Sequence, residues 1–293
     1  MQPAQFPSSA PEDLIPSYRA EVVYQCIGCQ RTFDIHQFLY TCPECKSLLR
    51  IEDTRFSELL KKPGSYWRSV FDYRAMLTRS PLKGIFRYYE FVLPVIPLDD
   101  IIYLGEGDTP IIRSNSSLSS FVGTQFYVKN DGLNPSVSFK DRGMASAISF
   151  INYLIRKENI TELLGICAST GDTSAAAALY LSYLDERIVR SVVLLPHGKV
   201  TPAQLSQPLG SGATVIEVPG VFDDCMKIVE ELAETYHVCL LNSKNPLRIL
   251  GQRSYSFEIS QQMDYDMEDL VVVVPIGNAG NVTAIMEGFL AFY

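Results

Sequence analysis

The hydrophobic pattern changes at about residue 124, where short apolar runs begin to alternate with segments that have apolar residues at helical spacing. We expect strands at 125–128, 163–168, 191–195, 214–218, 238–241 and 270–275. The helices between them are expected from Met144, from Ser174, at 203–207, 222–236 and 252–262, and from Gly280. Strands that alternate with helices in this way form parallel sheets covered on both faces, so the pattern predicts an α/β fold.

Two earlier segments lack this regularity. Residues 1–20 contain four prolines and no basic-then-apolar signal pattern, and we expect a disordered leader there. Residues 53–104 are rich in aromatic side chains but are interrupted by prolines. Such a mixture indicates short helices and loops that pack against a larger body.

The composition narrows the class of protein. A hydrophobic content of 47% and a charged content of 20% in 293 residues are typical of a globular protein with one or two domains. The net charge of −8 argues against a nucleic-acid partner, because no basic stripe is available to neutralise phosphates. No apolar run reaches the length of a membrane span and no targeting signal is present, so we expect a cytoplasmic protein with no membrane partner.

Four of the seven cysteines form two Cys-x-x-Cys pairs, Cys26 with Cys29 and Cys42 with Cys45. Each pair can place two thiolates on one side of a tight turn, and two such turns complete a tetrahedral zinc site. Because four thiolates leave no open position on the metal, its role would be structural. We therefore expect a small zinc ribbon at 21–52, with reduced free thiols or a decayed site as the alternative.

Lys140 lies in the segment Asn-Pro-Ser-Val-Ser-Phe-Lys-Asp-Arg-Gly at 134–143, where an irregular loop enters an amphipathic helix. Desolvation or nearby positive groups can lower the pKa of such a lysine enough for it to act as a nucleophile. It could then form a Schiff base with a carbonyl cofactor. A solvated lysine in a charged first turn is the alternative from this segment alone.

Three further loops follow predicted strands, and ligands of parallel α/β folds collect at such carboxyl ends. The loop 169–174 (Ser-Thr-Gly-Asp-Thr-Ser) offers hydroxyls and a helix N-terminus to an anion, although these residues are also common helix caps. The loop 277–281 (Gly-Asn-Ala-Gly-Asn) can bind one phosphate group through its backbone N–H groups or form a plain turn. Asn242, Ser243 and Arg248 offer an amide, a hydroxyl and a guanidinium, which suit a second oxyanion.

Taken together, these motifs resemble those of the threonine synthases, which are pyridoxal-phosphate enzymes with the tryptophan-synthase-β-like fold. The resemblance covers the chain from about residue 80 to its end, and the Cys-x-x-Cys pairs extend it. The matching segments are the lysine box at 134–143, the loops at 169–174 and 277–281, Leu-Gly-Glu-Gly-Asp-Thr-Pro at 104–110, and Asn242-Ser243 leading to Arg248 and Gly251-Gln252.

The resemblance implies a small domain at 135–245 that carries the Schiff-base lysine, and a large domain formed by 53–134 and 246–293. Threonine synthases continue well beyond the point at which this chain stops, inside the helix that opens at Gly280. The later segment completes the large domain and supplies the partner of the pyridine nitrogen. We therefore expect an incomplete large domain, with no residue here assigned to that partner.

By the same resemblance, Lys140 would hold pyridoxal phosphate as a Schiff base and transfer protons as general base and acid. Asp172 would approach the ring hydroxyl of the cofactor. The residues implied to bind the cofactor phosphate are Gly277, Asn278, Ala279, Gly280 and Asn281. Those implied to hold the substrate carboxylate are Ser169, Thr170 and Thr173. Those implied to bind the substrate phosphate are Asn242, Ser243 and Arg248, with Lys199 as a further helper.

The implied reaction converts O-phospho-L-homoserine and water to L-threonine and phosphate. The second anion site favours a phosphorylated amino-acid substrate over that of a serine or threonine dehydratase, because an unphosphorylated substrate would leave Arg248 unpaired. Cysteate synthase, which resembles threonine synthase and uses phosphoserine, is one alternative. A truncated, non-catalytic binding protein is another, and a homodimer is an open assembly state.

Overall fold

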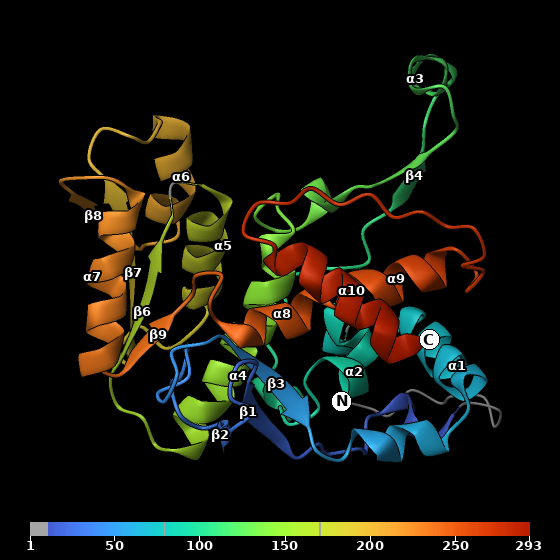
Figure 1. Ribbon diagram of the computed structural model, residues 1–293, viewed down its shortest axis with the longest axis horizontal. Coiled ribbons are helices and arrows are strands. Elements are labelled where there is room, and N and C mark those ends of the chain that lie inside the picture. Colours follow the sequence, from blue (N-terminus) through green and yellow to red (C-terminus); the bar gives the residue numbers. More distant parts are fainter. Residues whose placement is uncertain (1–10, 79, 170) are drawn as a thin grey trace.

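The computed structural model describes residues 11–78, 80–169 and 171–293 (Figure 1). Its amino-terminal part is a three-stranded antiparallel sheet of order β2-β1-β3, made of β1 (Val22–Cys26), β2 (Thr32–Asp34) and β3 (Leu49–Asp53). Alternate residues of β1 are buried, which gives this small sheet one inner face. The three strands fall in the segment for which the cysteines predicted a ribbon.

Residues 11–20 do not form the disordered leader that the prolines predicted. They include the 3₁₀ helix η1 (Glu12–Leu14), in which the side chain of Leu14 is buried. The fully buried guanidinium of Arg74 donates hydrogen bonds to the carbonyl oxygens of Asp13 and Leu14, at 2.6 and 3.1 Å. A buried guanidinium needs such acceptors, and they hold this segment against the body. Residues 1–10 of the expected leader lie outside the described residues.

Short helices follow, as the prolines and aromatic residues predicted. They are η2 (Phe56–Lys61), α1 (Gly64–Ala75), η3 (Pro81–Lys83), η4 (Ile85–Tyr88), α2 (Tyr89–Val92) and η5 (Leu98–Asp100). Phe91 packs edge-on against Trp67 and Phe71, with ring centroids 5.5 and 5.8 Å apart. Arg74 and Glu90 form a fully buried ion pair at 2.7 Å. An aromatic cluster and one buried ion pair therefore hold the short helices together.

Four of the expected strands form a parallel sheet in the order β8-β7-β6-β9, which confirms the α/β prediction (Figure 1). They are β6 (Leu163–Ala168), β7 (Val189–Pro196), β8 (Thr214–Val218) and β9 (Val238–Leu240). Helix α7 (Phe222–Thr235) packs on one face, against Leu194. Helices α5 (Asp172–Leu181) and α6 (Pro202–Gly210) pack on the other face, against Val193. Successive residues of a strand point to opposite faces, which is why the strands are continuous apolar runs.

The strand expected at 125–128 does not belong to this parallel sheet. Strand β5 (Tyr127–Lys129) pairs in antiparallel fashion with β4 (Ile111–Arg113), and α3 (Ser116–Val122) joins the two. The pair and α3 form an arm that projects from the body in Figure 1. The two strands are neighbours in the chain and run in opposite directions, so the pattern of alternating strands and helices that predicts the parallel sheet begins only at β6.

The prediction of a strand at 270–275 is wrong. This segment is not assigned to any strand, and the side chains of Val271 and Val273 are 82% and 90% exposed. A strand needs a neighbour to pair its backbone groups, and no strand among the described residues pairs with the four valines. The apolar run alone therefore did not determine a strand here.

Helix α4 (Lys140–Lys157) crosses α8 (Pro246–Gln252) at glycines. A Cβ added to Gly251 would lie 2.0 Å from the carbonyl oxygen of Arg142 and 2.4 Å from Ser146 Oγ. Only glycine allows the two backbones to approach this closely. The crossing places the first turn of α4, which begins with Lys140, beside Arg248 in α8. Helix α9 (Ser254–Gln262) corresponds to the helix expected at 252–262, and α10 (Gly280–Phe292) opens at Gly280 as predicted.

Candidate active site

A cavity of about 420 Å³ lies where the start of α4, the ends of β6 and β9, helix α8 and the loop before α10 meet. This is the carboxyl end of the parallel strands, where ligands of such folds bind. Most of the residues singled out from the sequence line the cavity. They are Lys140, Ser169, Thr173, Asn242, Ser243, Arg248, Gly277, Asn278, Ala279, Gly280 and Asn281.

Lys140 is the first residue of α4, and its loop is fixed from within. The carboxylate of Asp141 accepts hydrogen bonds from the backbone N–H and the hydroxyl of Ser136, both at 2.7 Å. The ammonium of Lys140 lies 3.7 Å from the ring centroid of Phe139. Burial and the positive charge of Arg248 lower the pKa of Lys140 from 10.5 to about 8. A neutral, nucleophilic amine is therefore available only slightly above neutral pH.

Arg248 is a buried cation without an anion. Its side chain is buried, Nη1 donates to the carbonyl oxygen of Leu241 at 3.0 Å, and Nε has no hydrogen-bond partner. No carboxylate forms an ion pair with it in the part of the chain that the structure describes. Burial lowers its pKa to about 10. An unpaired buried charge is costly, so this wall of the cavity is built for a negatively charged ligand.

The loop before α10 leaves room for a ligand against its backbone. A Cβ added to Gly277 would meet nothing within 4 Å, and one added to Gly280 would touch only Ile249, at 3.4 Å. The first N–H groups of α10 have no partners within the helix, which suits an anion. Asn278 Nδ2 donates to Ser243 Oγ at 3.2 Å, so this loop and the segment after β9 form one continuous wall.

Three of the expected residues differ from the rest. Asn242 lines the cavity but also bonds to the backbone, and Asp172 and Lys199 do not line the cavity. The side-chain amide of Asn242 accepts from the N–H of Ala168 at 3.0 Å and donates to its carbonyl oxygen at 2.6 Å, so it ties β9 to β6. Asp172 is exposed and accepts a hydrogen bond from Ser138 Oγ at 3.1 Å, and it does not line the cavity. Lys199 is exposed and also lies outside the lining residues. Thr170 lies outside the described residues.

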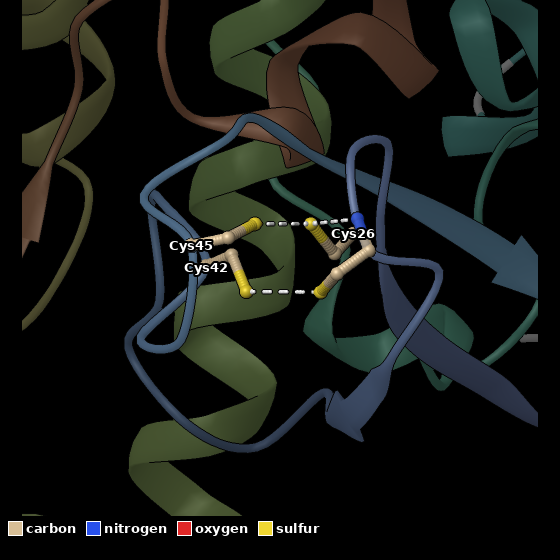
Figure 2. A group of neighbouring side chains, drawn as sticks. Cys26, Cys42 and Cys45 are labelled. Atoms are coloured by element: carbon tan, nitrogen blue, oxygen red, sulfur yellow. Dashed lines mark hydrogen bonds between the residues drawn. The ribbon is translucent and has the colours of Figure 1, made fainter.

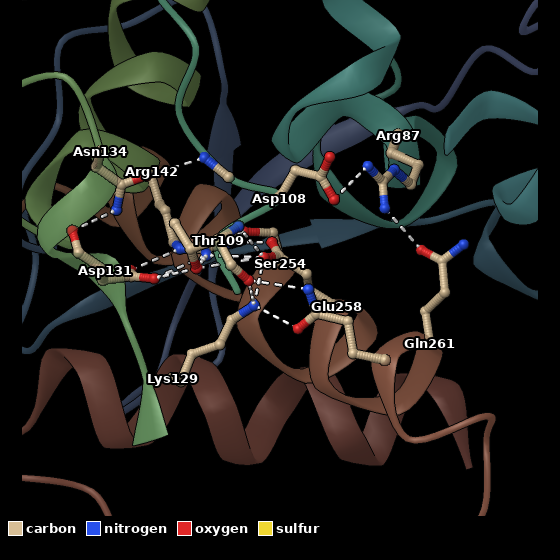
Figure 3. Close-up of polar contacts among 12 residues, drawn as sticks. Arg87, Asp108, Thr109, Lys129, Asp131, Asn134, Arg142, Ser254, Glu258 and Gln261 are labelled. Atoms are coloured by element: carbon tan, nitrogen blue, oxygen red, sulfur yellow. Dashed lines mark hydrogen bonds and ion pairs between the residues drawn. The ribbon is translucent and has the colours of Figure 1, made fainter. Parts of the chain in front are cut away.

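A buried polar network around Arg142 was not predicted from the sequence (Figure 3). Arg142 donates through Nε to Asp131 Oδ2 at 2.8 Å and through Nη1 to Glu258 Oε2 at 2.6 Å. Thr109, from the segment at 104–110, accepts from Arg142 Nη2 at 3.0 Å. Glu258 also pairs with Lys129. The network joins α4 and α9 to β5, to the 3₁₀ helix η6 (Asp131–Leu133) and to the segment at 104–110. In the sequence, only the charges of Arg142 and Glu258 within apolar helical segments pointed to it.

The four cysteines of the two pairs converge. Figure 2 shows the side chains of Cys26, Cys42 and Cys45 at this cluster. Their sulfur atoms all lie within 4.8 Å of one another, with Cys26 3.3 Å from Cys45 and Cys29 3.7 Å from Cys42. None of them forms a disulfide. Four sulfurs placed about 2.3 Å from a zinc ion would be about 3.8 Å apart, so the cluster has the dimensions of a tetrahedral thiolate site.

Comparison with known proteins identifies the family. The model of the pyridoxal-phosphate dependent enzymes matches residues 102–292. The chain belongs to this family. Its relatives include the threonine synthase of Methanocaldococcus jannaschii, 38% identical over 92% of this chain and 61% of the relative. Another is the threonine synthase of Bacillus sp. (strain ULM1), 40% identical over 72% of this chain and 56% of the relative.

Among solved structures, the pyridoxal-phosphate-bound threonine synthase from Brucella melitensis has a TM-score of 0.62 at 20% identity. The match covers 93% of this chain and 58% of that protein, and it confirms the expected fold. The chain spans about three fifths of the length of the curated relatives described above. In the described part of the chain, no helix has the length and apolar character that crossing a membrane requires.

Proposed function

We propose that this chain carries the lysine, the cofactor-phosphate loop and the substrate-phosphate wall of a threonine synthase. The reaction would convert O-phospho-L-homoserine and water to L-threonine and phosphate. Membership of the pyridoxal-phosphate family and identities of 38–40% to threonine synthases support this assignment. The small phosphorylated amino acid would be the partner of the cavity.

The observation that carries the proposal is the unpaired guanidinium of Arg248 beside Lys140. A cofactor that brings one phosphate needs one anion site, and the loop 277–281 supplies it. Arg248, with Ser243, would then serve a second phosphate, which is a feature of the substrate. Serine and threonine, the substrates of a dehydratase, carry no phosphate that would neutralise the charge of Arg248.

The residues of the cavity fit pyridoxal phosphate. Lys140 would hold the cofactor, and the backbone N–H groups from Gly277 to Asn281 would bind its phosphate. When bound, the cofactor supplies an electron sink for the carbon next to the substrate amino group. Lys140 would accept and return protons at that carbon, because its lowered pKa keeps it close to the working pH. Ser169 and Thr173, which also line the cavity, would orient the substrate carboxylate.

The test compares products from candidate substrates with the purified, cofactor-supplied protein. We expect phosphate release from O-phospho-L-homoserine, with threonine formed in equal amount, and loss of both in Arg248→Met. Pyruvate from serine or 2-oxobutyrate from threonine at a higher rate would instead make the protein a dehydratase. Sulfite-dependent phosphate release from phosphoserine would make it a cysteate synthase. A protein that cannot take up the cofactor would be a binding protein.

We propose in addition that Cys26, Cys29, Cys42 and Cys45 hold a structural zinc ion. The convergence of four free thiols at tetrahedral spacing supports this proposal, and a four-thiolate set leaves no position for a substrate. The ion would fix two tight turns in a small sheet that has little apolar core of its own.

A further inference from the structure

Tyr40, from the cysteine-bearing segment at 21–52, forms hydrogen bonds with the edge of the parallel sheet. Its hydroxyl donates to the carbonyl oxygen of Val238 at 2.8 Å and accepts from the N–H of Leu240 at 2.9 Å. These two groups belong to β9, the outermost strand of the order β8-β7-β6-β9. A single hydroxyl therefore satisfies one donor and one acceptor of the free strand edge.

The backbone of Tyr40 is held by the second cysteine turn. Thr41 forms a bridge with Leu48, and the N–H of Cys42 donates to the carbonyl oxygen of Ser47 at 2.8 Å. The N–H of Lys46 returns to the carbonyl oxygen of Cys42 at 2.9 Å. Tyr40 thus extends from a closed turn rather than from a free loop, and the order of that turn determines where its hydroxyl lies.

Strand β9 leads directly into the substrate-phosphate wall. The carbonyl oxygen of Leu241, the residue after β9, accepts the hydrogen bond from Arg248 Nη1. The carbonyl oxygen of Leu240 accepts from Asn245 Nδ2 at 2.9 Å, which fixes the turn that presents Ser243. A shift of the β9 edge would therefore move the acceptor that orients Arg248.

The cysteine-bearing segment also lies next to Ser243 and Asn278 of the substrate-phosphate wall. Ile27 and Leu48, from the two cysteine turns, line a cavity of about 180 Å³ together with Ser243 and Asn278. These last two residues also line the candidate active site. The cysteine-bearing segment therefore meets the phosphate-binding wall at two places, and of these the Tyr40 contact is the directional one.

We propose that Tyr40 is a positioning residue that couples the cysteine-bearing segment to the substrate-phosphate site through β9. This inference rests on the proposed function of Arg248 as a phosphate ligand. Its consequence is that losing one hydroxyl on the far side of β9 weakens binding of a phosphate at Arg248, while the link between Lys140 and the cofactor stays intact.

The test is the affinity for inorganic phosphate, measured by calorimetry on the full chain saturated with pyridoxal phosphate, so that the cofactor loop is already filled. We expect Tyr40→Phe to weaken phosphate binding on the order of fivefold, which corresponds to about one hydrogen bond. Tyr89→Phe is the matched control, since its buried hydroxyl donates to the carbonyl oxygen of Ile96 at 2.6 Å, away from β9. We expect the control to bind phosphate as the unmodified protein does, and cofactor absorbance to be equal in all three proteins.

Equal phosphate affinity in Tyr40→Phe and Tyr89→Phe would overturn the coupling while leaving the function of Arg248 intact. Phosphate binding by the unmodified protein that Arg248→Met does not reduce would instead overturn the proposed phosphate site, and the coupling with it. Hydrogen exchange provides a test that needs no variant. The Leu240 amide should exchange as slowly as that of Leu241, which pairs with Ile166. Exchange at the rate of an unprotected edge amide would also refute the coupling.

Discussion

Arg142 and Glu258 form a two-point ion pair in the core, with Nη1 to Oε2 at 2.6 Å and Nη2 to Oε1 at 3.2 Å. Arg142 is in the first turn of α4 and Glu258 is in α9, and both side chains are almost completely buried. The pair therefore fixes the helix that begins with Lys140 against the part of the chain that carries α8 and α10.

Replacing Arg142 tests how much this network contributes to the free energy of unfolding. Arg142→Met leaves the carboxylates of Asp131 and Glu258 buried without their main partner, and we expect a loss of about 3–5 kcal/mol in the free energy of unfolding. Urea unfolding followed by circular dichroism measures it. Arg187→Met, which breaks an exposed pair with Asp185, should leave the unfolding midpoint unchanged. Equal effects of the two substitutions would contradict the account.

The glycine at the helix crossing should be intolerant of a side chain. Gly251→Ala would place a Cβ 2.0 Å from the carbonyl oxygen of Arg142, so α4 and α8 must separate. We expect a loss of about 1–3 kcal/mol in stability and reduced cofactor content. Gly210→Ala, at the end of α6 where a Cβ meets nothing within 4 Å, is the control and should be neutral. A Gly251→Ala protein with unchanged stability would show that the helices are not in close contact.

The amine of Lys140 should become reactive at lower pH than an ordinary lysine. Its pKa is lowered to about 8, so the neutral form predominates above that pH and the labelling rate should rise through it. Removing the charge in Arg248→Met should move this midpoint to higher pH, because one of the two causes of the shift is lost. Mass spectrometry of the cofactor-free protein after brief exposure to an amine-reactive reagent gives the profile. A midpoint near 10.5 in the unmodified protein would disprove the lowered pKa.

The cysteine cluster should bind metal in a fixed ratio. We expect about one zinc ion per chain in the purified protein, with loss of the metal and a lower melting temperature in Cys42→Ser. Cys225→Ser, at a buried cysteine outside the cluster, should keep its zinc. Elemental analysis and thermal unfolding check both statements. A metal-free protein whose stability a chelator does not change would indicate that the thiols are free.

The sequence alone predicted those elements whose local pattern of apolar residues, or of turn residues, is distinctive. The four strands of the parallel sheet were predicted because each is a short apolar run followed by a segment with helical spacing. The lysine box and the loop at 277–281 were recognisable because proline restricts the backbone, whereas glycine permits conformations that other residues rarely adopt. In the structure both motifs line one cavity.

Other features depended on contacts that the local pattern does not contain. The valines at 271–274 have the composition of a strand, but a strand also requires a neighbour, which the described residues do not supply. Asn242 lines the cavity, but the local pattern did not indicate that its amide also bonds to both backbone groups of Ala168. The partnership of Arg142 with Glu258 spans 116 residues, and no local periodicity indicates it.

The site of covalent attachment of the cofactor tests whether Lys140 is the Schiff-base lysine. The purified protein is supplied with pyridoxal phosphate, reduced with borohydride, digested and analysed by mass spectrometry. We predict a visible absorbance band that the reduction abolishes, a single labelled peptide with the label on Lys140, and neither in Lys140→Ala. A colourless protein that cannot be reconstituted, or a label on a different lysine, would contradict it.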